Sequence, residues 1–386
     1  MEKKYDLIVV GGGILGTFHA YHALTSGLSV LLLEKDNFPV GATVRNFGQV
    51  IPSGMTGEWF TYGLRGLDVY ANIQRKFDIS VRNNGSIYIA SDPDEQLLLH
   101  ELHAHFERVG YPSQLFSKAT VLNRYPAVKS SYVREALFFP EEVSVEPHLM
   151  IHRLHQYLKQ RFEKFELVTD APVVGCEDTS AGATVTVSGG SRIIGAQVVI
   201  CNGNEFKLLF PELLAKSGQV ISKLQMMQTC PFPAAVLPGN VLTGLTIRRY
   251  ESFVECCPSF ASIATPDHYH ELQRWGIHIL FKQAADGSFI IGDSHEYADA
   301  TKLDELGYTL NEHINSLMLT EAERIVNVDV RKLASVWAGY YPQHPEKHIV
   351  ELDPSPNIHI RTCIGGKGMT AGIGYTEHSI NHLFDL

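Results

Sequence analysis

The fold is decided by a stretch near the amino terminus, Tyr5-Asp6-Leu7-Ile8-Val9-Val10-Gly11-Gly12-Gly13-Ile14-Leu15-Gly16. Residues 5–10 are largely β-branched and apolar on both faces, which is typical of a strand buried inside a parallel sheet. The glycines follow as G-x-G-x-x-G, and the residues up to about Gly27 have the spacing of a helix. A second apolar strand, 28–33, ends at the acidic residue Glu34. This order of strand, glycine turn, helix, strand and acid predicts a dinucleotide-binding unit.

Each glycine of the motif has its own predicted role. Gly11 makes the tight turn, Gly13 lets the backbone approach a pyrophosphate at the positive end of the helix, and Gly16 lets the helix lie close to the strand. Glu34 is expected to accept hydrogen bonds from ribose hydroxyls. The stretch 7–33 has no charged residue, but glycines at its centre and polar side chains such as His19 and His22 are unsuited to hydrocarbon. We therefore predict no membrane span.

Composition narrows the class of protein. The 386 residues predict two or three domains, and 45% apolar with 19% charged residues indicate a globular chain. The net charge of −10 disfavours nucleic acid as a partner and leaves a small ligand as the expected one. The six cysteines form no C-x-x-C pair, so we predict no disulfide framework, no metal site and a cytoplasmic location.

Three further segments carry a resemblance to a known family. They are Gly41-Ala42-Thr43-Val44-Arg45-Asn46-Phe47-Gly48-Gln49-Val50, the strand and turn at 196–204, and the strand at 357–362 with the glycine-rich turn 363–372. Together with the amino-terminal motif they resemble the D-amino-acid-oxidase-like family of FAD-dependent oxidoreductases, which includes glycine oxidase, sarcosine oxidase and D-amino acid dehydrogenase. Segments 41–50, 223–227, 242–250 and 291–297 are similar to a bacterial subgroup linked to aminophosphonate breakdown.

The resemblance implies an FAD site assembled from the start, middle and end of the chain. No His or Cys stands where relatives attach the flavin, so non-covalent FAD is expected. Residues 173–174 correspond to a segment that usually contacts adenine in the family. The predicted cofactor-binding residues are Gly11, Gly13, Ile14, Leu15, Gly16, Glu34, Lys35, Thr43, Arg45, Asn46, Gly48, Gln49, Val173, Val174, Cys201, Asn202, Gly203, Gly366, Lys367, Gly368, Met369 and Thr370.

The expected architecture is α/β, or α+β overall: a Rossmann-like FAD-binding domain with an inserted mixed-sheet substrate domain. The FAD-binding domain is predicted to be discontinuous, over 1–81, 144–221 and 331–386. The substrate domain is assigned to 82–143 and 222–330, where alternating strands such as 276–281 and 289–292 flank an Asp286-Gly287 turn. A helix is expected over 146–164.

Candidate substrate contacts follow from the chemistry that the resemblance implies. An anionic substrate group favours an Arg anchor, so Arg45, Arg248 and Arg249 are candidates. Arg248 and Arg249 are expected on a strand, where only one of them points into the pocket. His295 could accept a proton from a substrate ammonium if it titrates near neutrality, and Lys367 could stabilise a reduced flavin. The predicted catalytic residues are His295, Arg248, Tyr250, Tyr340 and Gln49.

Two departures from the family pattern affect the expected substrate and acceptor. Tyr341 stands where the family often has a carboxylate-binding Arg, and Ile290 stands where sarcosine oxidases have an oxygen-activating Lys. We expect oxidation of a small anionic amine or amino acid, such as 2-aminoethylphosphonate or its N-methyl form, to an imine that water hydrolyses. The electron acceptor is left open between O2, a quinone and an electron carrier. The alternatives are an FAD-dependent 2-hydroxyacid or glycerol-3-phosphate-type dehydrogenase, a non-catalytic flavoprotein subunit and, more weakly, an NAD(P) enzyme.

Overall fold

The computed structural model describes residues 4–180 and 182–386, and it begins with the predicted dinucleotide unit. Strand β1 (Lys4–Val10) leads into helix α1 (Ile14–Thr25) and then strand β2 (Val30–Leu33). β1 and β2 are parallel, with Leu7 opposite Val30 and Val10 opposite Leu33. The second strand starts two residues later than predicted because Ser29 is engaged by the Asp6 carboxylate.

The first sheet has the strand order β18-β19-β11-β1-β2-β8, extended by β9 and β10 to eight strands within the described residues. β11, β1, β2, β8 and β19 run parallel, whereas β18 is antiparallel to β19 and β10 is antiparallel to β9 and β11. The further strands of this sheet are β8 (Phe165–Val168), β9 (Val173–Thr179), β10 (Gly182–Val187), β11 (Arg192–Ile200), β18 (Val350–Ser355) and β19 (Ile358–Thr362).

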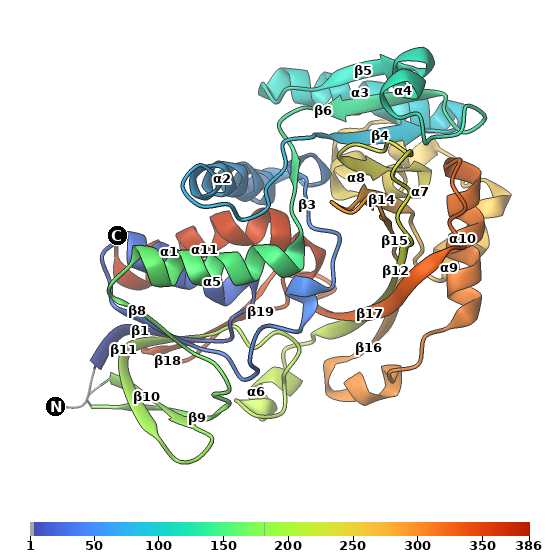
Figure 1. Ribbon diagram of the computed structural model, residues 1–386. Coiled ribbons are helices and arrows are strands. Elements are labelled where there is room, and N and C mark those ends of the chain that lie inside the picture. The colour runs from blue at the N-terminus through green and yellow to red at the C-terminus, as the bar shows by residue number, and fades with distance from the viewer. Residues whose placement is uncertain (1–3, 181) are drawn as a thin grey trace.

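Apolar packing covers both faces of this sheet, as the double-sided apolar pattern of β1 predicts. Leu7 and Val9 belong to a core cluster shared with α1, α5 (Pro147–Arg161) and α11 (Gly368–Phe384), while Ile8 and Val10 belong to a cluster on the opposite side. Figure 1 shows α1, α5 and α11 stacked together over one side of the sheet. The sheet therefore brings the start, middle and end of the chain together.

The second sheet has nine strands within the described residues, in the order β16-β12-β15-β14-β13-β4-β6-β5, with β17 also paired to β12. Their bounds are β4 (Ser86–Ala90), β5 (Gln114–Ser117), β6 (Glu135–Phe139), β12 (Val220–Thr229), β13 (Asn240–Leu242), β14 (Leu280–Gln283), β15 (Phe289–Gly292), β16 (Glu296–Asp299) and β17 (Leu333–Gln343). β14 and β15 form an antiparallel hairpin across the predicted Asp286-Gly287 turn.

The helices around the second sheet are mostly short. They are α3 (Pro93–Val109), α4 (Lys118–Arg124), α7 (Gly244–Ile247), α8 (Glu251–Cys256), α9 (His270–Arg274) and α10 (Glu312–Ile325). Helix α2 (Gly57–Gln74) packs on α11, and α6 (Pro211–Ala215) precedes β12. In Figure 1 the second sheet and its helices lie to one side of the first sheet. No described helix is long and apolar enough to cross a membrane.

Two connections join the sheets. β3 (Gln49–Val50) pairs with β7 (Val143–Ser144), and the buried Lys282 ammonium of β14 donates to the Val145 carbonyl and to the Glu146 carboxylate.

β17 lies within 331–386, which we assigned to the FAD-binding domain, yet it pairs with β12 of the second sheet along its whole length. The domain boundaries stay a prediction, with this strand as the point of difference.

Candidate functional site

A cavity lies beyond the carboxyl ends of the parallel strands, where open α/β sheets bind their ligands. Its walls include the last residues of β1 and β2, the residues after β11, and the turn between β19 and α11. Of the predicted cofactor residues, those that line it are Gly11, Gly13, Ile14, Leu15, Glu34, Lys35, Thr43, Asn46, Val173, Cys201, Asn202, Gly203, Gly366, Gly368 and Met369. Segments far apart in the sequence thus form one cavity.

The glycine turn has no room for larger side chains. Gly11 has φ +103°, and a Cβ there would lie 2.3 Å from the Cys201 carbonyl oxygen. A Cβ at Gly16 would lie 1.9 Å from the Gly11 carbonyl oxygen, which agrees with its predicted packing role. The Glu34 carboxylate accepts a hydrogen bond from the Gly12 N–H at 2.8 Å, and the Thr43 hydroxyl accepts one from the Ile14 N–H at 2.9 Å.

This donor arrangement fits a dinucleotide such as FAD. The amino-terminal turns of α1 and α11 both border the cavity, and first-turn N–H groups have no carbonyl partner within their own helix. Such N–H groups, together with the positive ends of the helix dipoles, attract phosphate and electron-rich groups. The acidic Glu34 side chain lies at the end of β2, where a ribose is bound in this fold.

The remaining predicted cofactor residues lie beside the cavity and are used for packing or hydrogen bonding. The Arg45 guanidinium donates to the carbonyls of Val40 and Ala338, which ties the loop after β2 to β17. A Cβ at Gly48 would lie 2.2 Å from a backbone oxygen, Gln49 donates to the Phe281 carbonyl, and the Thr370 hydroxyl accepts from the Ile51 N–H.

The last two predicted positions do not line the cavity with their side chains. Val174 is exposed, so the segment predicted to contact adenine through its backbone contributes only Val173 to the cavity wall. The Lys367 ammonium is paired with the Glu251 carboxylate at the start of α8. Lys367 lies outside the cavity lining, and its role at the flavin stays a prediction.

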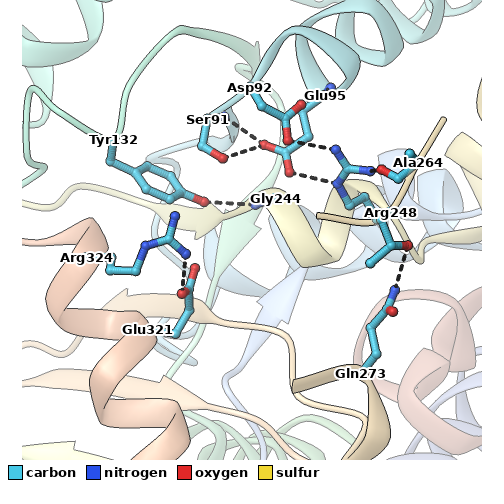
Figure 2. A network of polar contacts seen from close by, with 11 residues as sticks. Ser91, Asp92, Glu95, Tyr132, Gly244, Arg248, Ala264, Gln273, Glu321 and Arg324 are labelled. Carbon is cyan, nitrogen blue, oxygen red and sulfur yellow. Dashed lines mark hydrogen bonds and ion pairs between the residues drawn. The ribbon is translucent and has the colours of Figure 1, made fainter. Parts of the chain in front are cut away.

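Arg248 does not have the predicted position or role. It follows helix α7 instead of lying on a strand, so the alternation of faces that we expected for Arg248 and Arg249 does not occur. Its guanidinium bonds the Glu95 carboxylate at 2.9 Å, Asp92 at 2.7 Å and the Ala264 carbonyl at 2.8 Å. Figure 2 shows these partners enclosing Arg248, with Ser91 completing the contacts of Glu95.

Arg248 is held in this position because a buried carboxylate on a helix of the second sheet needs a cation. Glu95 on α3 is fully buried, and a buried carboxylate requires a compensating cation. Arg248 supplies that cation and is itself only 8% exposed. Arg249, by contrast, is exposed, with one N–H group bonded to the Gly276 carbonyl at 2.8 Å. Of these two arginines, only Arg249 is accessible to a ligand.

The other predicted catalytic residues also differ from expectation. His295 does not titrate near neutrality, because burial, opposed by Asp293, lowers its pKa to about 3. The Tyr340 ring lines the cavity, but its hydroxyl donates to the Gly307 carbonyl. Tyr250 is half-buried and its ring meets those of Tyr88 and His278 edge-on. Gln49 is held by Phe281, as described above, and does not line the cavity.

Sequence reasoning missed part of the cavity wall. Asp36, Ala171, Pro172 and Glu205 all line it. Asp36 follows Glu34 and Lys35 directly, so proximity to the acid could have indicated it, whereas the others come from irregular segments without a motif.

A buried histidine behind the glycine turn was also missed. The His155 ring on α5 lies 3.1 Å from the Gly12 carbonyl and 2.9 Å from the Thr17 hydroxyl, and burial lowers its pKa to about 4. It therefore supports the turn from behind as a neutral ring. Helical periodicity placed it on a helix but gave no sign of this contact.

The family is decided by a match that covers nearly the whole chain. The model of the family described as FAD dependent oxidoreductase, of the D-amino acid oxidase type, matches residues 6–378. The chain belongs to this family. It is therefore an FAD-dependent oxidoreductase, and the cavity is its candidate FAD site.

Solved structures share the fold over their whole length. Glycine oxidase from Geobacillus kaustophilus superposes with a TM-score of 0.78 at 15% identity, covering 100% of this chain and 95% of that one. L-proline dehydrogenase from P. horikoshii gives 0.80 at 17% identity, covering 100% and 94%. L-α-glycerophosphate oxidase from Mycoplasma pneumoniae with FAD bound gives 0.77 at 17% identity, covering 99% and 95%. These identities support a common fold only.

Curated relatives match over shorter stretches. The mitochondrial pyruvate dehydrogenase phosphatase regulatory subunit of Mus musculus is 25% identical over 151 residues, which are 38% of this chain and 17% of that protein. Glycerol 3-phosphate dehydrogenase of Caloramator mitchellensis is 25% identical over 139 residues, which are 35% of this chain and 29% of that protein. The chain thus spans less than a third of each of these relatives.

Proposed function

We propose that this FAD-dependent oxidoreductase oxidises the carbon–nitrogen bond of a small amine or amino acid. FAD, when bound, would supply the acceptor for a hydride, that is, for the hydrogen of the substrate C–H bond with its two electrons. The substrate leaves as an imine, which water hydrolyses to a carbonyl compound and a released amine. The observation that carries the proposal is the full-length likeness to glycine oxidase and L-proline dehydrogenase, combined with a cavity at the family's FAD position.

The charged residues of the cavity wall lie on one side of it, which suggests that the cofactor and the substrate bind at different ends. Among the described residues that line it, the formally charged ones are Glu34, Lys35, Asp36 and Glu205, all of which follow β2 or β11. The wall formed by Tyr340, Tyr341 and Pro342 of β17 carries no formal charge. We assign the substrate to this neutral side, where a small amine can be held in a largely water-free space beside the cofactor.

The contact with an anionic substrate group is now assigned to Arg249. Arg248 is neutralised by Glu95 and Asp92, and Tyr341 occupies the position of the family's carboxylate-binding Arg. Arg249 is exposed and follows α7 next to Tyr250. A phosphonate or carboxylate would bind such a planar guanidinium in a bidentate manner. An aminophosphonate such as 2-aminoethylphosphonate is the narrower form of the proposal.

We further propose that FAD is held without a covalent bond and that the protein is cytoplasmic. Cys201 and Cys363 line the cavity, but the Cys363 thiol donates to the Gln219 side chain and burial raises the pKa of both thiols to about 12. Neither is therefore a reactive thiolate at neutral pH. Denaturation followed by filtration should release free FAD into the filtrate; flavin that stays with the chain would contradict this.

An anaerobic screen tests the proposed reaction. The purified yellow protein is mixed with amines that carry a carboxylate, a phosphonate or no anionic group, and the loss of flavin absorbance is followed. Bleaching by anionic amines, with a carbonyl product and one released amine per flavin reduced, is the expected result. If only uncharged amines bleach the flavin, the assignment of Arg249 fails but amine oxidation stands.

Two other functions have some support. The likeness to L-α-glycerophosphate oxidase and to a glycerol 3-phosphate dehydrogenase favours oxidation of a hydroxyl group as the second candidate. The match to a phosphatase regulatory subunit favours a flavoprotein without its own substrate. Bleaching by glycerol 3-phosphate or 2-hydroxyacids, but by no amine, would establish the first of these alternatives. A flavin that none of these compounds reduces would favour the second.

A further inference from the structure

Three side chains with metal-binding atoms meet on the β14–β15 hairpin, at the ends of the strands that face away from its turn. His278 precedes β14, and Asp293 and His295 follow β15. The backbones of His278 and Asp293 pair through two hydrogen bonds, of 3.1 and 2.9 Å, which extend the hairpin beyond both strands. The His295 N–H donates to the Trp275 carbonyl at 2.9 Å, so the third residue is also fixed relative to the hairpin.

The side chains converge on one point. His278 Nε2 lies 2.9 Å from Asp293 Oδ1, and the imidazole rings of His278 and His295 are stacked with centroids 5.6 Å apart. One ligand atom from each of the three residues lies within 4.8 Å of the others. Two imidazoles and one carboxylate are the ligand set of open transition-metal sites, in which the remaining positions are left to water or substrate.

The outer hydrogen bonds of both histidines suit metal binding. His278 Nδ1 lies 3.2 Å from the Thr246 hydroxyl, and His295 Nδ1 lies 2.9 Å from the Gly276 carbonyl. A carbonyl can only accept, so His295 carries its proton on Nδ1 and presents a lone pair on Nε2. Metal-bound histidines are generally oriented in this way, through a hydrogen bond from the ring nitrogen that does not bind the metal.

The carboxylate is buried and lies close to the first histidine. Asp293 is 8% exposed, and its Oδ1 atom lies 2.9 Å from His278 Nε2 in a geometry that is not aligned as a hydrogen bond. A metal ion bound between these two atoms would give the buried carboxylate oxygen a well-placed partner. His278 is buried as well, whereas His295 is half-buried, so access to the cluster is from the His295 side.

We propose that His278, Asp293 and His295 bind a divalent transition-metal ion of the zinc class. With ligand distances of about 2.0–2.2 Å, two tetrahedral ligand atoms lie about 3.4 Å apart, so a separation of 4.8 Å must close by about 1.4 Å. A change of rotamer of the half-buried His295 side chain can supply this movement. Arg249 is the nearest cation, with one of its nitrogens 3.4 Å from His295 Nδ1, on the side of the ring away from the ligand atom. Because Arg249 is exposed, solvent weakens its repulsion of the ion.

The position suggests what the ion does, a step that rests on the proposed function. β15 pairs with β12, and β12 pairs with β17, which contributes Tyr340 and Tyr341 to the cavity wall. Neighbouring strands lie about 4.8 Å apart, so the cluster is about two strands from that wall. An ion with open positions there would attract the anionic end of a substrate, together with Arg249, in place of the neutralised Arg248.

Metal binding is tested on the FAD-loaded protein, without reference to activity. The protein is stripped with a chelator, and zinc is titrated in by calorimetry at low micromolar protein concentration. We expect one equivalent per chain with micromolar or tighter affinity. Asp293→Asn and His295→Gln should each weaken binding at least about tenfold while keeping full FAD absorbance. His313→Gln is the matched control, because His313 forms an exposed pair with Glu271 elsewhere on the surface.

The outcomes separate the metal site from the proposed function. No zinc binding by the wild-type protein, or binding that is the same in Asp293→Asn, His295→Gln and His313→Gln, would overturn the metal site. If zinc binds as expected but its removal leaves the KM for an anionic amine unchanged, the ion does not hold the substrate. If zinc binds as expected and no amine reduces the flavin, the proposed reaction fails while the metal site stands.

Discussion

The two ends of the cavity are built in different ways. At the cofactor end, a short continuous stretch supplies the glycine turn and the start of α1, and Gly11 and Gly16 leave no room there for a side chain. We place the substrate at the other end, where β17 supplies Tyr340 and Tyr341 to the cavity wall. The α7–α8 connection and the β14–β15 hairpin, to which we assign the contacts with an anionic group, come from distant segments of the chain. A site formed by backbone atoms requires glycines at positions where a side chain would clash. A site formed by side chains requires that their polar groups are not already bonded to neighbouring residues.

The largest effect is expected from Gly11→Ala at the cofactor end. The new Cβ would lie 2.3 Å from the Cys201 carbonyl oxygen at φ +103°, and neither backbone can move without displacing β1 or β11. Overpacking and a positive φ together cost roughly 4 kcal/mol, which corresponds to about a thousandfold loss of FAD affinity. Flavin content after purification measures the loss. Gly27→Ala is the control, since Gly27 also has a positive φ but meets no described atom within 4 Å; equal loss there would show that strain alone is responsible.

At the substrate end, Arg248→Met should mainly reduce stability. It leaves the fully buried Glu95 without its cation, which costs about 3–5 kcal/mol. Urea denaturation followed by tryptophan fluorescence measures this change. Arg331→Met removes an exposed pair with Glu323 and should cost less than about 1 kcal/mol. A stable Arg248→Met protein with a strongly raised substrate KM would show that Arg248 contacts substrate after all.

A pH effect is expected from Glu142, a fully buried carboxylate beside Ser53 and Tyr111. Its carboxylate accepts from the Ser53 N–H at 2.8 Å, and burial raises its pKa to about 7. Because the folded state holds this proton more tightly than the unfolded state, the contribution of Glu142 falls as pH rises from about 4.5 to about 7, by roughly 3 kcal/mol in total.

Glu142→Gln should remove most of this pH-dependent loss of stability. The free energy of unfolding of the variant, relative to that of the wild type, should therefore rise from pH 5 to pH 8. Paired urea denaturation curves at the two pH values give the difference directly. Glu141→Gln changes the exposed neighbour and should leave the wild-type pH dependence intact. A parallel pH profile for Glu142→Gln and the wild type would contradict the raised pKa.

The smallest effect is expected from Thr43→Val, again at the cofactor end. The valine keeps the shape but leaves the Ile14 N–H at the start of α1 without its acceptor. One lost hydrogen bond costs about 1–2 kcal/mol, or roughly tenfold in FAD affinity. Thr25→Val, at the other end of α1, loses a bond to the His22 carbonyl and should leave FAD affinity unchanged. FAD titration of the apoproteins compares the two variants.

The sequence predicted the cofactor end because its signals are local. The G-x-G-x-x-G turn, the strands beside it and Glu34 occur in one stretch, and each element forms with close to the expected bounds. The family resemblance and the mixed second sheet were also confirmed. The exposure of Val174 and the pairing of Lys367 with Glu251 were not visible in the sequence, because a motif gives the path of the backbone and not the direction of each side chain.

The substrate end could not be predicted because its residues depend on distant partners. Nothing in the spacing of Arg248 shows that Glu95, more than a hundred residues earlier, needs a cation. His278 and Asp293 became neighbours only through the pairing of β14 with β15, so no ligand motif was visible. The pKa of His295 likewise depends on burial, which local sequence does not reveal.

We propose that the substrate end selects an amine over an alcohol, and a matched pair of compounds distinguishes the two. 2-Aminoethylphosphonate, or its N-methyl form, and 2-hydroxyethylphosphonate share one skeleton and one anion and differ in the group at the reacting carbon. Each is mixed anaerobically with the yellow protein, and flavin absorbance is followed in a stopped-flow instrument. We expect rapid bleaching by an amine and none by the alcohol. Bleaching by the alcohol, with the flavin unchanged by either amine, would contradict it.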